Sequence, residues 1–227
     1  MGEIGLQYGA AWLARYAAVA GTDKRIVDAE MREMRRWFAS RYPAETRQSL
    51  HHLDLGTCTG RYLRWGLSQG FRIICGVDAS MDAVAYCSRL CRPGRLCVHH
   101  ADFLHEPTVS ALFARHPPFH LVTMMMGTIN HVAPARQGLL LQLLGEALHP
   151  EGRLLVSAWR PGACGLSLYS PEARNYLEST GLAPELLTSS ASRGIPGLQM
   201  TRQLSTPWHV LVEFSRRGSS ELVRSRE

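Results

Sequence analysis

Three aspartates at the ends of three successive apolar runs have the type and spacing of a ligand-binding site. Asp54 lies in the run before a glycine-bracketed turn, Gly56-Thr57-Cys58-Thr59-Gly60, while Asp78 ends the next run and Asp102 follows the third. Strand, tight loop and helix form a nucleotide pocket, because glycine lets the backbone approach a ligand and the helix start offers free N–H groups. Asp78 comes about 20 residues after the loop, where an acidic residue accepts hydrogen bonds from ribose hydroxyls.

The loop spacing argues against a dinucleotide or a triphosphate. An NAD loop has the pattern G-x-G-x-x-G, whose glycines admit a pyrophosphate. Here the pattern is G-x-C-x-G, with Cys58 at the middle position, and no Gly-Lys-Ser/Thr follows. Asp102 is placed to accept from an exocyclic amine while Phe103 packs beside a base. The pattern favours a nucleoside ligand without phosphate. For Asp78 a second interpretation is that it caps the helix near Ser80, although Ser80 can cap that helix itself.

The elements that position these residues alternate regularly from residue 50 onward. Apolar runs lie at 50–55, 71–77, 95–98, 119–125 and 153–159, separated by segments of helical length at 60–69, 80–92, 106–115 and 133–148. This alternation implies a mostly parallel sheet covered on both faces, and right-handed crossovers make it doubly wound. A weak strand is expected at 183–188, and residues 198–204 and 208–215 predict a C-terminal antiparallel hairpin. We therefore predict an α/β fold with a seven-stranded, mostly parallel sheet.

The length of 227 residues fits a single domain. We divide it into an N-terminal helical lid at 1–48, an α/β core at 49–216 and a flexible tail at 217–227. Two amphipathic helices are expected in the lid, the second with Ile26, Glu30, Met34, Trp37 and Phe38 on one face. Three aromatic residues of the first helix are candidates to close over the pocket and contact the substrate: Tyr8, Trp12 and Tyr16.

The composition limits the partners. The net charge of +6 comes almost entirely from scattered arginines, without the basic stripe of a nucleic-acid protein, so no nucleic-acid partner is expected. No run reaches the length of a membrane span, and the N-terminal sequence lacks the layout of a signal peptide. We expect a cytoplasmic protein that acts as a monomer or a homodimer.

The six cysteines do not predict a disulfide framework in a chain of this kind. One group invites a metal interpretation: Cys87, Cys91 and Cys97 with His99 and His100. Its spacing is not C-x2-C, and these side chains would lie across a helix, a turn and a strand. No metal is therefore expected.

The loop and the aspartates resemble those of the class I S-adenosylmethionine-dependent methyltransferases. The resemblance is carried by Asp54-Leu55-Gly56-Thr57-Cys58-Thr59-Gly60, Val77-Asp78-Ala79-Ser80 and Ala101-Asp102-Phe103, and it covers roughly residues 45 to 215. It implies S-adenosyl-L-methionine as cofactor and S-adenosyl-L-homocysteine as product. The family usually has glycine where Cys58 stands, and it often has an acidic residue where His120 stands, so His120 is given no role.

The resemblance also implies where the cofactor binds. The loop, with Gly56, Thr57, Cys58 and Gly60, would hold the methionine part, with Asp54 near its amino group. Asp78 and Ala79 would contact the ribose, and Asp102 and Phe103 the adenine. Met124, at the end of the fourth strand, would line the pocket.

The acceptor side is expected after the fourth strand, in Gly127-Thr128-Ile129-Asn130-His131. It lacks the Asn/Asp-Pro-Pro-aromatic motif of base methyltransferases and is similar to the loop of small-molecule enzymes, including glycine-type N-methyltransferases. A biosynthetic N-methyltransferase is thus favoured over an O-methyltransferase. His131 is the candidate base, with Asn130 orienting the substrate; equally, His131 can cap or pack under the next helix. Thr128 and His209 are candidate substrate contacts.

Two other functions stay open. A catalytically inactive or non-methylating cofactor-binding protein can have the same fold. An NAD-type oxidoreductase is the second alternative, which the loop spacing disfavours.

Overall fold

The computed structural model describes residues 13–14, 24–103, 105–160, 175, 177, 179–180 and 194–218. Several sequence expectations lie outside these residues: the contacts of Tyr8, Trp12 and Tyr16, the strand at 183–188 and most of the tail. Among the described residues, no helix combines the length and the apolar character needed to cross a membrane.

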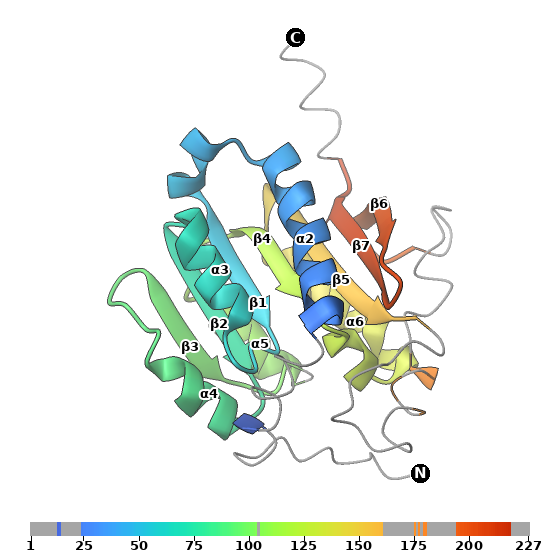
Figure 1. Cartoon of the computed structure of the whole chain (residues 1–227), viewed down its shortest axis with the longest axis horizontal. Helices are drawn as coiled ribbons and strands as arrows, with labels where there is room; N and C mark the ends of the chain where they lie inside the picture. The colour runs from blue at the N-terminus through green and yellow to red at the C-terminus, as the bar shows by residue number, and fades with distance from the viewer. Residues whose placement is uncertain are drawn as a thin grey trace.

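The described part of the chain forms one seven-stranded sheet with the order β3-β2-β1-β4-β5-β7-β6 (Figure 1). Strands β1 to β5 are parallel, and β7 is antiparallel to both β5 and β6. The strands are β1 (His51–Leu55), β2 (Ile73–Asp78), β3 (Leu96–His100), β4 (Phe119–Met124), β5 (Leu148–Trp159), β6 (Leu198–Ser205) and β7 (His209–Arg216). The predicted α/β fold with a C-terminal antiparallel hairpin is confirmed.

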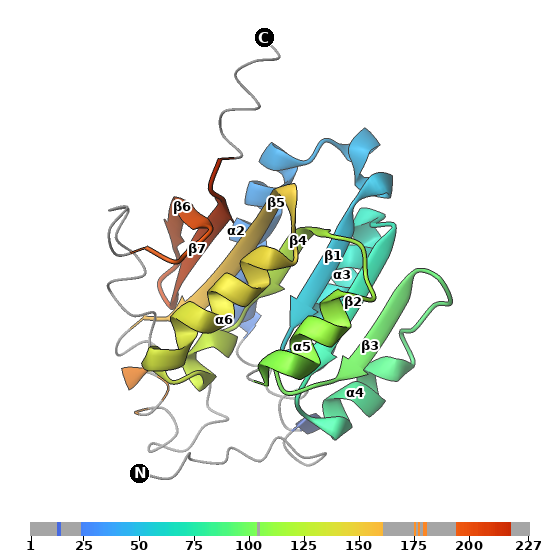
Figure 2. The same cartoon turned by 180° about the vertical axis from the view of Figure 1, so that it is seen from behind.

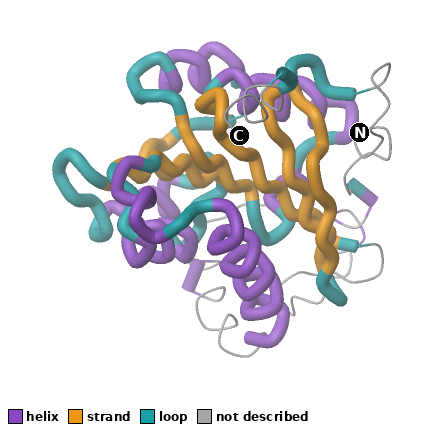
Figure 3. Tube along the Cα trace, turned by 90° about the horizontal axis from the view of Figure 1, so that it is seen from above, coloured by secondary structure: helices purple, strands orange, loops and turns teal. Residues whose placement is uncertain are grey.

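Helices cover both faces of the sheet, as Figure 3 shows from above. Helices α2 (Lys24–Arg41), α3 (Arg61–Gln69) and α4 (Met81–Ser88) lie on the face seen in Figure 1. Helices α5 (Glu106–Phe113) and α6 (Pro134–Glu146) lie on the face seen in Figure 2. Two short 3-10 helices, η1 (Ala44–Ser49) and η2 (Thr128–His131), complete the elements. Each sheet face has its own cluster of buried apolar side chains.

Helix α2 is held on the sheet by apolar and ionic contacts. Its Trp37 and Phe38 are buried, and burial of such side chains stabilises by roughly 1.5–3 kcal/mol each. The Trp37 indole N–H donates to buried Glu213 of β7 at 2.8 Å, and the guanidinium groups of Arg41 and Arg153 lie 3.1 and 3.2 Å from the same carboxylate. Because two arginines and an indole N–H surround Glu213, its charge is compensated in the core.

Strand β5 begins earlier than the sequence indicates. The sequence places the fifth apolar run at 153–159, but residues 148–152 also belong to the strand. They form an irregularity opposite β4: Phe119 pairs with Leu148, whereas Leu121 pairs with Arg153. A Cβ atom at Gly152 would lie 2.6 Å from the Phe119 carbonyl oxygen. Glycine thus allows the two backbones to approach where the extra residues bulge out.

The hairpin forms one edge of the sheet, with β6 outermost. Its pairing with β7 shifts register between Met200 and Arg202, which marks a bulge. Thr201, Arg202 and Gln203 are exposed, so this edge strand is polar in its middle.

Candidate functional site

The predicted ligand-binding edge is the carboxyl end of the parallel strands. Asp54 lies one residue before the end of β1, Asp78 ends β2 and Met124 ends β4. The strand order reverses between β1 and β4, and open α/β sheets bind ligands beyond the strand ends at such a switch point. The loop of residues 56–60 follows β1 and lies at this edge.

The loop adopts left-handed backbone at three positions, with φ of 72° at Gly56, 47° at Cys58 and 71° at Gly60. A Cβ atom at Gly56 would lie 2.7 Å from the Thr128 side chain, so glycine lets the loop meet the segment after β4. Cys58 has a side chain where the backbone favours glycine, which costs about 1–2 kcal/mol. This explains why glycine is usual at that position. Thr57 is buried and packs against β2, where a Cβ at Gly76 would lie 2.7 Å from its methyl group.

We expect the substitution Cys58→Gly to raise the free energy of unfolding by about 0.5–1 kcal/mol, because relief of the left-handed strain exceeds the entropy cost of glycine. Thermal unfolding would show a Tm higher by about 2 °C. Cys91 is the matched control, since its φ is not positive. Cys91→Gly should lower the Tm; a lower Tm for Cys58→Gly as well would contradict the strain argument.

Asp54 is a buried carboxyl group with one open oxygen. Its side chain is 1% exposed, Oδ1 accepts from the Thr123 hydroxyl at 2.8 Å, and Oδ2 has no hydrogen-bond partner among the residues that the structure describes. Burial raises the pKa of Asp54 to about 8. The Thr123 hydroxyl lies 2.9 Å from Nε2 of His52, whose pKa burial lowers to about 3. Since the hydroxyl donates to Asp54, it accepts from the Nε2–H of neutral His52. The open oxygen suits a cationic group of a ligand.

Asp78 organises the loop. Its Oδ2 accepts from the backbone N–H of Cys58 and its Oδ1 from that of Ser80, both at 2.8 Å. Burial raises the pKa of this half-buried carboxyl. Ser80, not Asp78, caps α4, because the Ser80 hydroxyl accepts from the Ala83 N–H at 3.3 Å. Asp78 thus ends β2 with its side chain facing the loop, a placement that agrees with the ribose interpretation.

The other expected cofactor residues border the same edge. Ala79 is exposed after β2, and its carbonyl oxygen lies 3.1 Å from Nε2 of His100. Asp102 is exposed two residues after β3, and Phe103 packs partly against the core. Met124 is fully buried. The edge therefore holds a carboxylate at or near the end of each of three neighbouring strands.

The segment after β4 is shaped by two left-handed residues, Met126 with φ of 56° and Gly127 with φ of 71°. A Cβ at Gly127 would lie 2.2 Å from the indole nitrogen of Trp159, so only glycine fits there. Thr128 begins η2 against Gly56, and His131 ends it. His131 is half-buried, and burial lowers its pKa to about 4, so the imidazole is neutral at pH 7.

Asn130, expected to orient a substrate, has internal partners. Its side chain is buried; Nδ2 donates to the Leu177 carbonyl at 2.6 Å, and Oδ1 accepts from the Trp159 N–H at 3.0 Å. The Thr180 hydroxyl donates to its backbone carbonyl. These contacts join η2 to the end of β5.

Sequence reasoning missed Glu30, a fully buried carboxylate on α2. It accepts hydrogen bonds from the Tyr62 hydroxyl, the Met126 N–H at 3.0 Å and the Ser157 hydroxyl at 2.7 Å. All three partners donate, as an ionised carboxylate requires. The available signal was its place in the apolar series between Ile26 and Met34, since an acidic residue on the buried face of a helix needs partners.

His209, a candidate substrate contact, lies beside Glu30. Its Nδ1 is 3.4 Å from the Glu30 carboxylate, and its ring centroid is 4.1 Å from that of Trp159. The side chain is fully buried, which lowers its pKa, while Glu30 opposes that shift. His209 therefore packs behind the loop after β4, next to the carboxylate that binds the Met126 N–H.

The fold is similar to solved structures of methyltransferases. Magnesium protoporphyrin IX methyltransferase ChlM from Synechocystis, solved with bound S-adenosylmethionine, gives a TM-score of 0.58 at 14% identity, over 92% of this chain and 93% of that one. CcbJ methyltransferase from Streptomyces caelestis gives 0.58 at 15%, over 83% and 90%. N-methyltransferase NodS from Bradyrhizobium japonicum, solved with S-adenosyl-L-homocysteine, gives 0.52 at 14%, over 80% and 91%.

No protein-family model matches the chain, and comparison with curated protein sequences gives no match either. The likeness thus lies in the overall fold, at 14–15% sequence identity. The chain has the fold of S-adenosylmethionine-dependent methyltransferases.

Proposed function

We propose that the protein is an S-adenosylmethionine-dependent methyltransferase that acts on a small molecule, with nitrogen favoured over oxygen as acceptor. The observation that carries the proposal is the open, buried Oδ2 of Asp54 beneath the glycine loop, at the switch point of the sheet. The amino-acid part of S-adenosylmethionine carries an ammonium group, which can donate a hydrogen bond to this oxygen. Because this cofactor contains no pyrophosphate, its pocket needs no loop that binds one.

The cofactor, when bound, would supply a methyl group on a sulfonium centre. Asp54 would accept hydrogen bonds from its ammonium group, and Asp78 would accept from the ribose hydroxyls with the lone pairs that Cys58 and Ser80 leave free. Asp102 and Phe103 would bind the adenine. In-line transfer depends mainly on positioning donor and acceptor, so the chain's main task is to orient both and to exclude water.

The acceptor would lie against the segment after β4. His131, a neutral imidazole at pH 7, would accept the proton that the acceptor loses, with Thr128 lining the pocket beside Gly56. We assign Asn130 to holding η2 in place. We assign His209 and Glu30 to the wall behind the loop. NodS is an N-methyltransferase, which agrees with a nitrogen acceptor.

Calorimetric titration tests the cofactor. We expect heat with S-adenosylhomocysteine and none with NADH; the opposite result would establish the oxidoreductase alternative. Asp78→Ala should weaken the binding, and unchanged affinity would refute the ribose assignment. Incubation with host extract and S-adenosylmethionine should then give a product heavier by one methyl group. Cofactor binding without any such product would favour the inactive alternative.

We expect His131→Ala to lower kcat about 100-fold, the contribution of a positioned base, with S-adenosylhomocysteine affinity unchanged. Because the pKa of His131 is about 4, wild-type kcat at saturating cofactor should stay level from pH 8 to pH 5 on its account. Activity would be measured with the acceptor found in the extract. His51→Ala is the control, because His51 begins β1 and so lies at the amino end of the parallel strands. Full turnover of His131→Ala would remove it as the base.

The methyl acceptor that we propose is a small molecule rather than a nucleic acid. A small molecule fits the scattered arginines and the segment after β4, which lacks the motif of base methyltransferases. A monomer or homodimer in the cytoplasm stays a prediction.

A further inference from the structure

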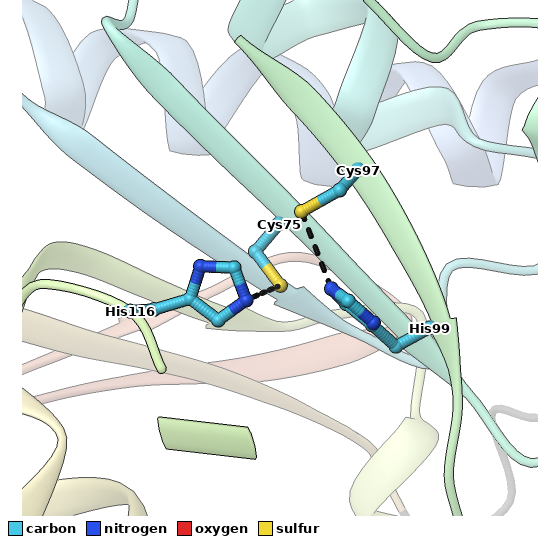
Figure 4. Close-up of side chains that lie close together, drawn as sticks. All are labelled: Cys75, Cys97, His99 and His116. Carbon is cyan, nitrogen blue, oxygen red and sulfur yellow. Dashed lines mark hydrogen bonds between the residues drawn. The ribbon is translucent and has the colours of Figure 1, made fainter. Parts of the chain in front are cut away.

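Two cysteines and two histidines meet on the face of the sheet that α5 covers (Figure 4). Cys75 comes from β2, Cys97 and His99 come from β3, and His116 comes from the segment between α5 and β4. One ligand atom from each of the four residues lies within 4.8 Å of all the others. Nothing in the proposed methyl transfer uses this cluster.

The fold brings the four together through register and alternation. Cys75 pairs with Cys97 in the parallel ladder of β2 and β3, so their side chains lie next to each other on one face. His99 is two residues after Cys97, and residues two apart in a strand share a face. His116 ends the turn after α5, where its backbone N–H donates to the Phe113 carbonyl at 3.0 Å. Four side chains from three segments of the chain are thus directed at one point.

The distances approach those of a tetrahedral metal site. Nε2 of His99 lies 3.3 Å from the sulfur of Cys97, and Nε2 of His116 lies 3.9 Å from the sulfur of Cys75. Zinc with bonds of about 2.3 Å to sulfur and about 2.0–2.1 Å to nitrogen separates a sulfur and a nitrogen ligand by about 3.6 Å. These two separations lie on either side of this value, and the remaining ligand-atom separations are at most 4.8 Å. Side-chain movement of about 1 Å would therefore complete the geometry.

The surroundings explain why a cation fits. In Figure 4 a nitrogen of each imidazole points at a sulfur, with the rings 5.3 Å apart at 69°. Cys75 is fully buried, and the other three are half-buried. Two thiolates and two neutral imidazoles balance the charge of a divalent cation, and an S2N2 tetrahedron is typical of zinc.

We propose that Cys75, Cys97, His99 and His116 bind one Zn²⁺ as a structural site. Four protein ligands leave no open position, which is the arrangement of structural rather than catalytic zinc. On binding, both thiols lose their protons to solvent. The ion ties the edge strand β3 to β2 and to the chain that enters β4. Asp102 follows β3, so the site also steadies the strand that presents the proposed adenine-binding carboxylate.

The proposal revises the expectation that the chain has no metal. The group considered in the sequence contained Cys97 and His99 but lacked the other two ligands. His100 faces Ala79, and Cys87 belongs to the core on the opposite sheet face.

Elemental analysis tests the site. The full chain, produced in zinc-supplemented medium and purified without chelator, should contain about one zinc per chain. Cobalt exchanged into the site should give the near-ultraviolet absorption of thiolate-to-metal charge transfer and the visible bands of a tetrahedral ion. Removal of zinc by a chelator should lower the Tm, because metal binding is coupled to folding.

Single substitutions locate the ion. Cys97→Ser and His116→Ala should each weaken zinc binding by more than about 100-fold. Replacing a residue that only contacts a metal ligand costs about 10- to 100-fold in metal affinity, so loss of a ligand itself should cost more. Cys91→Ser and His100→Ala, outside the cluster, should retain it. Three outcomes would each overturn the proposal. The first is wild-type protein that takes up neither zinc nor cobalt, and the second is equal metal content in all four variants. The third is a Cys75–Cys97 disulfide in the unreduced protein. The cobalt spectrum of wild-type protein decides the question even if a variant does not fold. Metal content is read without cofactor, so either proposal can fail alone.

Discussion

Replacing Asp54 with asparagine is expected to weaken S-adenosylhomocysteine binding by about 30-fold or more while the protein stays folded. Loss of one partner of a buried charge pair costs about 2–5 kcal/mol, and 2 kcal/mol is about 30-fold. Asparagine keeps the shape and can still accept from Thr123, which holds Oδ1 of Asp54 at 2.8 Å. Stability should not fall, because the substitution removes a carboxyl group that lies buried with one oxygen unpartnered.

Asp28, exposed on α2, provides the matched control. Asp28→Asn should leave the calorimetric affinity unchanged within about twofold, as surface substitutions do. If Asp54→Asn bound S-adenosylhomocysteine as tightly as this control, the ammonium would not contact Asp54.

The same carboxyl predicts how binding depends on pH. The pKa of Asp54 is about 8 in the free protein, so at pH 7 the group is largely protonated. An ammonium ligand favours the ionised form, and binding below pH 8 therefore releases a proton. The affinity for S-adenosylhomocysteine should fall by up to about tenfold for each pH unit below 8. Binding enthalpies measured in two buffers would count the proton, and Asp54→Asn should lose the dependence.

Glu30→Gln is expected to lower the free energy of unfolding by about 3 kcal/mol, the cost of breaking a buried ionic network. The Glu30 carboxylate accepts from Tyr62, Met126 and Ser157. The glutamine amide has one acceptor oxygen, and its NH2 group donates instead of accepting. The NH2 group would therefore face a hydroxyl or N–H donor in a fully buried site, and that hydrogen bond would be lost. Thermal unfolding should show a Tm lower by roughly 6–12 °C.

Glu33→Gln on the same helix is the control. Within the described part of the chain its carboxylate pairs with exposed Arg36 alone, at 2.8 Å, so its loss should cost less than about 1 kcal/mol. Because Glu30 holds the Met126 N–H, Glu30→Gln should also reduce kcat through the loop that carries His131. Equal Tm values for the two variants would mean that the network around Glu30 contributes little.

The central part of the fold follows from the sequence because local and global signals agree there. The run at 50–55, the glycine loop and the run ending at Asp78 each predict one element and its end, and the structure has β1, α3 and β2 there. Strand β5 was placed too late, because Pro150 and Gly152 indicate a turn. The pairing of β5 with β4 allows those residues to bulge without ending the strand.

The positions of the three carboxylates were predictable because each belongs to one strand end. Asp54, Asp78 and Asp102 needed only the rule that parallel strands end at one edge. Glu30 and the zinc cluster depend on contacts between distant segments. Cys97 and His99 share a face by alternation, but their pairing with Cys75 depends on register. The position of His116 depends on how α5 packs, which no local pattern encodes.

The bulge in β6 bears on how copies of the chain can associate. An edge strand adds to another sheet only where its backbone groups form a continuous row, and a bulge or a charged side chain interrupts that row. The register shift at Met200–Arg202, beside exposed polar side chains, does so in the middle of the outermost strand. A homodimer of this protein would therefore have to be built from helix or loop surfaces rather than as one sheet continuous across two chains at this edge.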